Sequence, residues 1–139
     1  ASSQWILIDA ARRRPIALRE NLPMYQVIGE RVIDTDFPKI SEPQKIDEAA
    51  EFFIRFDDID LNNHVNNAVY PLWASEAVGI DFRAAHTPAE IEIAFKKEGL
   101  YGEDIRVETE FDNLTTIHRI KATGDGRELA RVRICWIGI

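Results

Sequence analysis

The order of hydrophobic patterns after residue 47 constrains the fold more than any other feature of this sequence. AAEFFIRF at 49–56 is rich in aromatic and branched residues, which is typical of a strand. NNAVYPLWASEAVGIDFRAA at 66–85 is typical of a helix instead. Its apolar residues recur at three and four positions: Val69, Leu72, Trp73, Ala77 and Ile80. Pro71 falls about one turn into this segment and removes one N–H group.

Four further strand candidates follow the helical segment. EIEIAF at 90–95 and DIRVETEF at 104–111 alternate apolar and polar residues, so each places its apolar side chains on one face. TTIHRIKA at 115–122 precedes the Asp125-Gly126 pair, a strong signal for a two-residue hairpin turn, and RELARVRICWIGI at 127–139 follows it. The sequence therefore predicts a strand, one long helix and four strands that pair antiparallel.

This order of elements restricts the way in which the core can be built. One helix cannot cover both faces of a five-stranded sheet. A sheet that curls around a single, nearly all-apolar helix solves the problem, and this is the hotdog arrangement, of the α+β class. Such a sheet leaves an edge and an apolar seam exposed, so we expect the chain to pair with a second copy as a homodimer.

The N-terminal third shows no such regularity. WILIDAARRRPIAL at 5–18 indicates a short strand, a polar turn and a second extended piece. Residues 19–45 carry three of the six prolines and no sustained period, which indicates a connecting segment with one short helical turn at 23–28. The predicted organisation is an N-terminal strand and connecting segment over 1–47 and a hotdog domain over 48–139.

Composition and charge exclude several classes of protein. The net charge of −7 argues against nucleic acid as a partner. The 45% hydrophobic content supports a real core, while no apolar run approaches the ~18 residues that span a bilayer. Cys135 is the only cysteine, so disulfides cannot organise the fold. We therefore expect a cytoplasmic protein without a membrane partner.

An asparagine cluster marks the candidate site. Four of the six asparagines lie at 62–67, around His64, within DIDLNNHVNNAVY. An N-cap at Asn66 or Asn67 accounts for one of them. Three other side chains, Asp60, Asn62 and His64, have the spacing D-x-N-x-H just before the helix, where free N–H groups could polarise a carbonyl. A histidine beside a carboxylate can act as a general acid or base near neutral pH.

Metal and nucleophile chemistries fit the sequence less well. DIDLNN begins like a calcium loop, but Asn63 stands where the loop needs glycine and Val69 where it needs glutamate. No second histidine or cysteine lies at zinc-ligand spacing from His64. Ser75 lacks a Gly-x-Ser-x-Gly context, and Cys135 has no nearby partner in sequence.

One resemblance covers essentially the whole chain. DLNNHVNNAVYPLW resembles the active-site segment of acyl-acyl-carrier-protein thioesterases, D-x-N-x-H-V-N-N-x-x-Y-x-x-W, at every fixed position. FKKEG at 95–99 is similar to a downstream segment of that family, and WILIDAARRRPIAL resembles the closing strand of its first hotdog. Because those enzymes fuse two hotdogs, the resemblance implies that most of an N-terminal hotdog is absent here.

The resemblance also implies a role for individual residues. Asp60 would hold Asn62 and His64, which would bind and polarise the thioester, and Glu98 would be the general base. Many members have cysteine after that glutamate, but this chain has Gly99, which favours water activated by a carboxylate over a cysteine nucleophile. No metal or organic cofactor is implied. The remaining fixed residues are expected to bind substrate: Asn66, Asn67, Tyr70 and Trp73.

The expected function is hydrolysis of long-chain acyl thioesters to free fatty acids, and the expected partner is acyl carrier protein. The net charge of −7 opposes docking of an acidic carrier protein, so the basic clusters at 12–14, 96–97 and 131–133 would have to act locally. Two alternatives stay open. Hotdog enoyl-thioester hydratases use a D-x-N-P-x-H pattern, in which Asn63 would be proline. An isolated half-protein could also pair with itself without catalysing any reaction. The sequence fixes neither the acyl chain length nor the choice between carrier protein and coenzyme A.

Overall fold

The computed structural model describes residues 3–9, 11–12, 14–22, 29–30 and 37–139. The chain divides into two compact units, 1–38 and 39–139. The segment 39–47, which the sequence groups with the N-terminal part, thus belongs to the second unit, where it lies against the sheet.

The first unit contains a small antiparallel pair and one helical turn. Strands β1 (Ile8–Asp9) and β2 (Arg14–Pro15) pair antiparallel, and helix α1 (Leu18–Asn21) follows. The Asp9 carboxylate accepts the N–H groups of Ala11 and Arg12 at 2.9 and 2.8 Å, which closes the turn between the strands. The helical turn expected at 23–28 and Arg13 of the basic cluster lie outside the described residues.

The second unit is built on a five-stranded sheet. Its strands are β3 (Glu48–Phe53), β4 (His86–Phe95), β5 (Asp104–Asp112), β6 (Thr115–Ala122) and β7 (Glu128–Gly138). Their order in the sheet is β3-β5-β6-β7-β4, and every neighbouring pair is antiparallel. The prediction of about five antiparallel strands is confirmed. Strand β4 begins earlier than the expected residue 90, and its Pro88 is tolerated because β4 is an edge strand.

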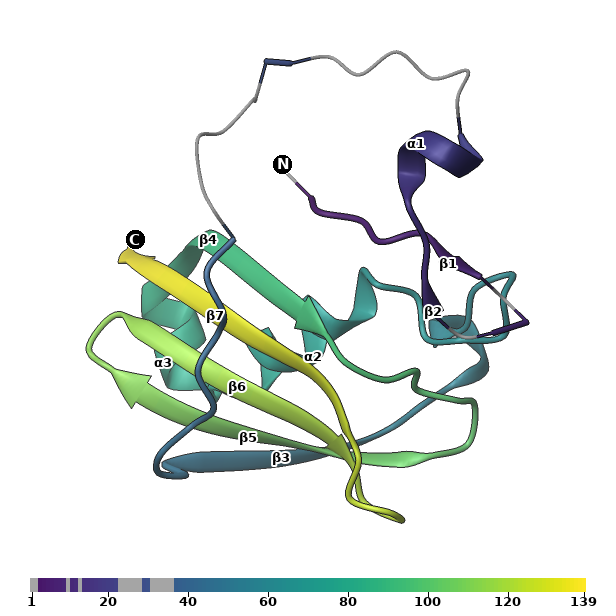
Figure 1. Ribbon diagram of the computed structural model, residues 1–139. Coiled ribbons are helices and arrows are strands. Elements are labelled where there is room, and N and C mark those ends of the chain that lie inside the picture. Colours follow the sequence, from purple (N-terminus) through teal and green to yellow (C-terminus); the bar gives the residue numbers. More distant parts are fainter. Residues whose placement is uncertain (1–2, 10, 13, 23–28, 31–36) are drawn as a thin grey trace. The chain divides into compact units, whose positions relative to one another are not determined.

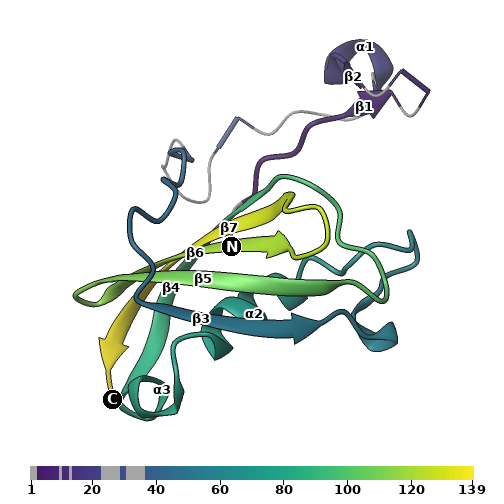
Figure 2. The same cartoon turned by 90° about the horizontal axis from the view of Figure 1, so that it is seen from below.

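The helical segment differs from the single long helix that the sequence predicts. Helix α2 spans Val69–Glu76 and helix α3 spans Ile80–Ala85, and both lie on one face of the sheet (Figures 1 and 2). Gly79 separates them with φ = 76°, a conformation that L-residues other than glycine rarely adopt. The prediction of one helix over 66–85 is therefore wrong. The helical spacing of apolar residues continues across Gly79, although the backbone conformation of this glycine interrupts the helix.

The late start of α2 explains the position of Pro71. The N-cap of the helix is Ala68, not Asn66 or Asn67 as the sequence suggests. Pro71 is then the third helical residue, where a backbone N–H would have no partner within the helix. The proline therefore fits the first turn without loss of a helical hydrogen bond.

The core lies between α2 and the inner face of the sheet. Tyr70, Trp73 and Ala74 of α2 are at most 5% exposed. Alternate residues of the three central strands meet them: Ile105, Val107, Ile120, Ala122, Ala130, Val132, Ile134 and Trp136. This alternation is the period of two that the sequence shows in 104–111. Within the described part of the chain, no helix has the length and apolar character needed to cross a membrane.

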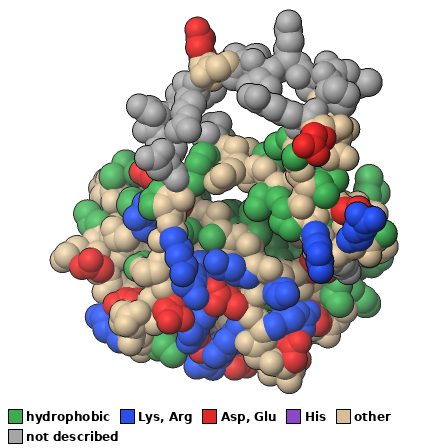
Figure 3. Space-filling view, in the orientation of Figure 1, with side chains coloured by type: hydrophobic (Ala, Val, Ile, Leu, Met, Phe, Trp, Pro, Cys, Tyr) green, Lys and Arg blue, Asp and Glu red, His purple; other side chains and the backbone are tan. Residues whose placement is uncertain are grey.

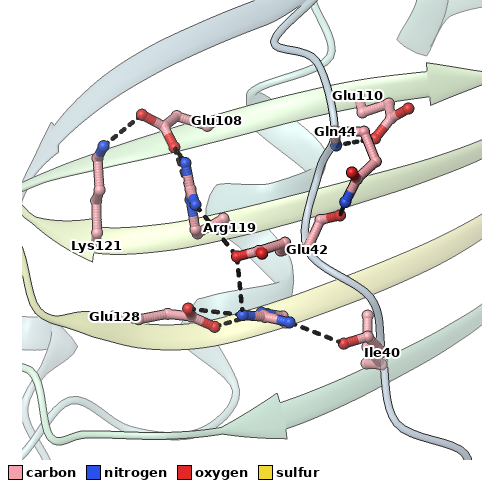
Figure 4. A network of polar contacts seen from close by, with 9 residues as sticks. Ile40, Glu42, Gln44, Glu108, Glu110, Arg119, Lys121 and Glu128 are labelled. Atoms are coloured by element: carbon pink, nitrogen blue, oxygen red, sulfur yellow. Dashed lines mark hydrogen bonds and ion pairs between the residues drawn. The ribbon is translucent and has the colours of Figure 1, made fainter.

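The outer face of the sheet carries paired charges and the segment 39–47. Figure 3 shows lysine and arginine side chains interspersed with acidic ones over this face. Glu108 is 3% exposed and forms ion pairs with Arg119 and Lys121, which also lower the pKa of its carboxyl group against the effect of burial (Figure 4). Arg131 bonds Glu128, and it donates to the carbonyl of Ile40 at 3.2 Å, which holds the segment across the strands.

Candidate active site

A tight loop before α2 carries the D-x-N-x-H residues. Ile59 and Val65 form an isolated antiparallel bridge, and the N–H of Asp60 donates to the carbonyl of His64 at 2.8 Å. Asn63 turns the chain between them with φ = 62°. Asparagine is among the few residues other than glycine that enter this left-handed region readily. The bend thus accounts for one asparagine of the cluster by backbone conformation alone.

The Asp60 carboxylate organises the inside of this loop. It accepts the backbone N–H of Asn62 at 2.8 Å, the Asn62 side-chain amide at 3.3 Å and the backbone N–H of His64 at 3.4 Å. The Asn62 backbone N–H is the main reason why the pKa of Asp60 lies below its ordinary value; desolvation opposes it. The structure therefore brings Asp60 into contact with both residues that it was expected to hold.

His64 meets Glu98 across two loops. The Nε2 atom of His64 lies 3.7 Å from the Oε2 atom of Glu98, which comes from the connection between β4 and β5. The two side chains are 39% and 50% exposed, so both are open to an incoming molecule. A histidine and a carboxylate at this separation can share a water or a substrate atom between them. The sequence places these residues 34 positions apart, and the fold brings them together.

The two loops are joined through Gly99. The N–H of Val65 donates to the carbonyl of Gly99 at 3.0 Å. A Cβ atom at Gly99 would lie 3.0 Å from Val65 Cγ2 and 3.1 Å from Ile54 Cδ1, closer than side chains normally pack. Glycine at this position therefore permits the close approach of the backbone that sets Glu98 opposite His64.

The four expected substrate-binding residues lie in two different environments. Asn66 and Asn67 are exposed, and the Asn66 side-chain oxygen accepts the N–H of Ala68 at 3.0 Å. Tyr70 and Trp73 are 2% and 5% exposed, with ring centroids 5.4 Å apart in the core. Burial raises the pKa of the Tyr70 phenol, whereas a hydrogen bond from the backbone N–H of Gly99 acts in the opposite direction. Substrate contact by these four residues stays a prediction.

The comparisons with known proteins identify the family. Residues 41–138 match the family described as the acyl-ACP thioesterase C-terminal domain. The chain belongs to this family. A palmitoyl-acyl carrier protein thioesterase, chloroplastic, from Arabidopsis thaliana is 25% identical over 158 residues, covering 98% of this chain and 37% of its own length. An acyl-[acyl-carrier-protein] hydrolase, chloroplastic, from Cuphea viscosissima is 26% identical over 105 residues, covering 70% of this chain and 26% of its own.

Solved thioesterase structures share the fold of this domain. A 12:0-ACP thioesterase from Umbellularia californica has a TM-score of 0.73 and 18% identity, covering 95% of this chain and 53% of that one. An acyl-ACP thioesterase from Bacteroides thetaiotaomicron has a TM-score of 0.75 and 17% identity, covering 94% and 53%. At these identities the likeness shows the fold alone, which is hotdog-like. The chain spans about half the length of these structures and 37% of the Arabidopsis relative.

Two contacts of this thioesterase domain escape sequence reasoning. Glu103 accepts the backbone N–H of Leu100, and Arg127 donates to the carbonyl of Glu98. Arg127 lies 29 positions after Glu98, beyond the hairpin turn, and no motif links the two. Among the described residues, no group of three or more histidine, cysteine, aspartate or glutamate side chains is arranged to hold a metal ion.

Proposed function

We propose that this chain hydrolyses long-chain acyl thioesters, carried by acyl carrier protein or a related thiol, to free fatty acids. The observation that carries the proposal is the approach of His64 to Glu98 at 3.7 Å beside the Asp60-Asn62 hydrogen bonds. Membership of the acyl-ACP thioesterase family and the names of its relatives support the same activity. No observation favours hydration of an enoyl thioester instead.

The arrangement suggests a division of labour among four residues. Glu98 removes a proton from a water molecule, whose oxygen attacks the carbonyl carbon of the thioester. Asn62 and His64 face the carbonyl oxygen and stabilise the charge that develops on it, while Asp60 holds both in position. When the carbon–sulfur bond breaks, the thiolate takes the proton from Glu98. The acid product and the thiol then leave, and Glu98 returns to its ionised form.

The direct test is hydrolysis of palmitoyl-acyl carrier protein and palmitoyl-coenzyme A by the purified chain. We expect turnover in the wild type and a loss of roughly 10²–10⁴-fold in Glu98→Ala, because general-base catalysis contributes about that much. Glu51→Ala, which removes an exposed carboxylate on β3, is the matched control and should retain the wild-type rate. A wild-type chain that folds but hydrolyses neither substrate would favour the alternative of a non-catalytic half-protein.

We further propose that the chain forms a homodimer. Strand β4 is an edge of the sheet, ten residues long, with Ile91 and Phe95 exposed at 41% and 48%. Open edges with apolar side chains favour pairing with another copy. Light scattering should give twice the 15.9 kDa chain mass, and a monomer at micromolar concentration would contradict the proposal.

A cytoplasmic location stays a prediction that rests on the single cysteine, and the plant relatives are named as chloroplastic.

A further inference from the structure

The turn that carries Glu98 is held by a pair of charged side chains outside the motif. We infer that Arg127 and Glu103 are positioning residues for Glu98, and this inference rests on the proposed function. Nη2 of Arg127 lies 2.6 Å from each carboxylate oxygen of Glu103 and donates to the backbone carbonyl of Glu98 at 3.3 Å. The same guanidinium therefore contacts the backbone of the residue whose side chain faces His64.

Glu103 completes the connection from the other end of the turn. Its Oε2 atom accepts the backbone N–H of Leu100 at 2.9 Å, two residues after Glu98. The carbonyl of Gly99, between them, accepts the N–H of Val65 at 3.0 Å. The carbonyls of Glu98 and Gly99 thus each accept a hydrogen bond from a residue outside 98–100, and the N–H of Leu100 donates one to such a residue. We call Arg127, Glu103 and these bonds the Glu98 clamp.

The arginine is itself fixed by the hairpin that precedes β7. Its Nη1 atom donates to Asp125 at 2.9 Å, and the backbone N–H of Arg127 donates to the other oxygen of Asp125 at 3.1 Å. The Arg127 and Glu103 side chains are each 26% exposed, so solvent competes with these bonds only in part. A planar guanidinium can serve two carboxylates and a carbonyl at once, which a lysine ammonium does with less geometric control.

Position matters here because Glu98 acts from an exposed turn. Packing holds a carboxylate that is 50% exposed only in part, so a shift of its backbone would move the carboxylate relative to His64. A misplacement of about 1 Å in a catalytic group can cost on the order of 10²-fold in rate. The clamp would keep Glu98 opposite His64 without itself touching the substrate.

A double-mutant cycle in kcat separates positioning from general stability. Arg127→Ala should lower kcat for palmitoyl-coenzyme A by roughly 10-fold in the chain with Glu98, with little change in KM. In a Glu98→Gln background the same substitution should cost less than about two-fold, because a residue that acts through Glu98 has nothing left to position. Equal losses in both backgrounds would overturn the inference and leave the proposed function standing.

Arg106→Ala is the matched control for loss of one arginine. Arg106 pairs with Glu51 and Glu108 on the outer face of the sheet and is not part of the site. The Arg106→Ala substitution should leave kcat unchanged both in the chain with Glu98 and in the Glu98→Gln variant. Arg127→Lys, which keeps the charge, should restore only part of the rate, since a single ammonium replaces the guanidinium fork. Full restoration would show that charge, not geometry, is what Arg127 supplies.

Amide hydrogen exchange tests the clamp without any enzyme assay. The Val65 N–H is bonded to Gly99 and belongs to a residue that is 4% exposed, so it should exchange slowly in the wild type. We expect exchange at Val65 and Leu100 to become at least about 10-fold faster in Arg127→Ala and to stay unchanged in Arg106→Ala. Unchanged exchange in Arg127→Ala would overturn the clamp. Faster exchange in a chain without hydrolysis would retain the clamp and reject the proposed function.

Discussion

Two histidines of this domain show how surroundings decide what one residue type can do. His64 is 39% exposed and faces Glu98 from a loop held by backbone hydrogen bonds. His118 is fully buried in β6, on the same face of the sheet as Ile120. Its two ring nitrogens lie 3.0 and 2.7 Å from the hydroxyl groups of Thr109 and Thr116.

The difference lies in the chemistry that each histidine can support. Burial lowers the pKa of His118 to about 3, so the ring is neutral at every pH where the protein would be used. Its threonine partners satisfy the ring without offering a charge, and Trp136 donates to Thr116 at 2.9 Å to complete the group. His64 has solvent and a carboxylate beside it instead. We therefore expect His64 to affect rate and His118 to affect stability.

The largest expected effect is on the rate of the His64→Ala variant. Removal of the imidazole should lower hydrolysis of palmitoyl-coenzyme A by roughly 10²–10⁴-fold, because the carbonyl loses a polarising group. The urea midpoint should change little, since the side chain is partly exposed and packs in no core. Steady-state kinetics and urea unfolding on the same samples measure both quantities. A variant that unfolds more easily yet hydrolyses at the wild-type rate would reverse the comparison.

The second prediction concerns the pH dependence of stability through His118. Its folded pKa of about 3 lies below the ordinary value of 6.5, so the unfolded chain binds a proton between these values and the folded chain does not. The stability that this group contributes is therefore complete above pH 6.5 and is lost as the pH falls toward 3. The loss amounts to roughly 4–5 kcal/mol, at 1.4 kcal/mol for each pKa unit.

The variant His118→Asn separates the contribution of His118 to the pH dependence of stability from that of the acidic groups. Urea unfolding of the wild type and His118→Asn should be measured from pH 7 to pH 4. The wild type should lose more stability than the variant, so the difference between them should shrink as the pH falls. His64→Ala serves as the control and should follow the wild type. A constant difference between the wild type and His118→Asn across this range would show that His118 is not held neutral.

The two histidines also show which features of the structure could be predicted from the sequence. Alternation predicted the strands because burial on one face repeats every two residues. In TTIHRIKA, however, Ile117 and Ile120 fall on opposite faces, so the pattern does not say whether His118 points inward. The motif around His64 predicted Asp60, Asn62 and His64 as site residues because they lie close together in sequence. Glu98 was expected only from the resemblance of FKKEG to the family's downstream segment. The break at Gly79 and the contact of Arg127 with Glu98 depend on backbone angles and long-range pairing, which a local pattern does not encode.

The smallest expected effect is at Gly99, where the site loops meet the core. In Gly99→Ala the new Cβ would lie 3.0 Å from Val65, 3.1 Å from Ile54 and 3.3 Å from the Tyr70 hydroxyl. All three neighbours are buried residues that cannot move far, so overpacking should destabilise the fold by about 1–3 kcal/mol. The rate should also fall, because movement of Gly99 away from Val65 lengthens their 3.0 Å hydrogen bond and displaces Glu98.

Gly124→Ala is the matched control for this substitution. A Cβ at Gly124 would meet no atom within 4 Å, so the variant should keep both the stability and the rate of the wild type. Urea unfolding and kinetics with palmitoyl-coenzyme A measure the two outcomes. If Gly99→Ala lost stability but kept the rate, the turn could absorb the methyl group without moving Glu98, and packing and chemistry would be separable at this position. Loss of both would mean that the core itself sets the distance between His64 and Glu98.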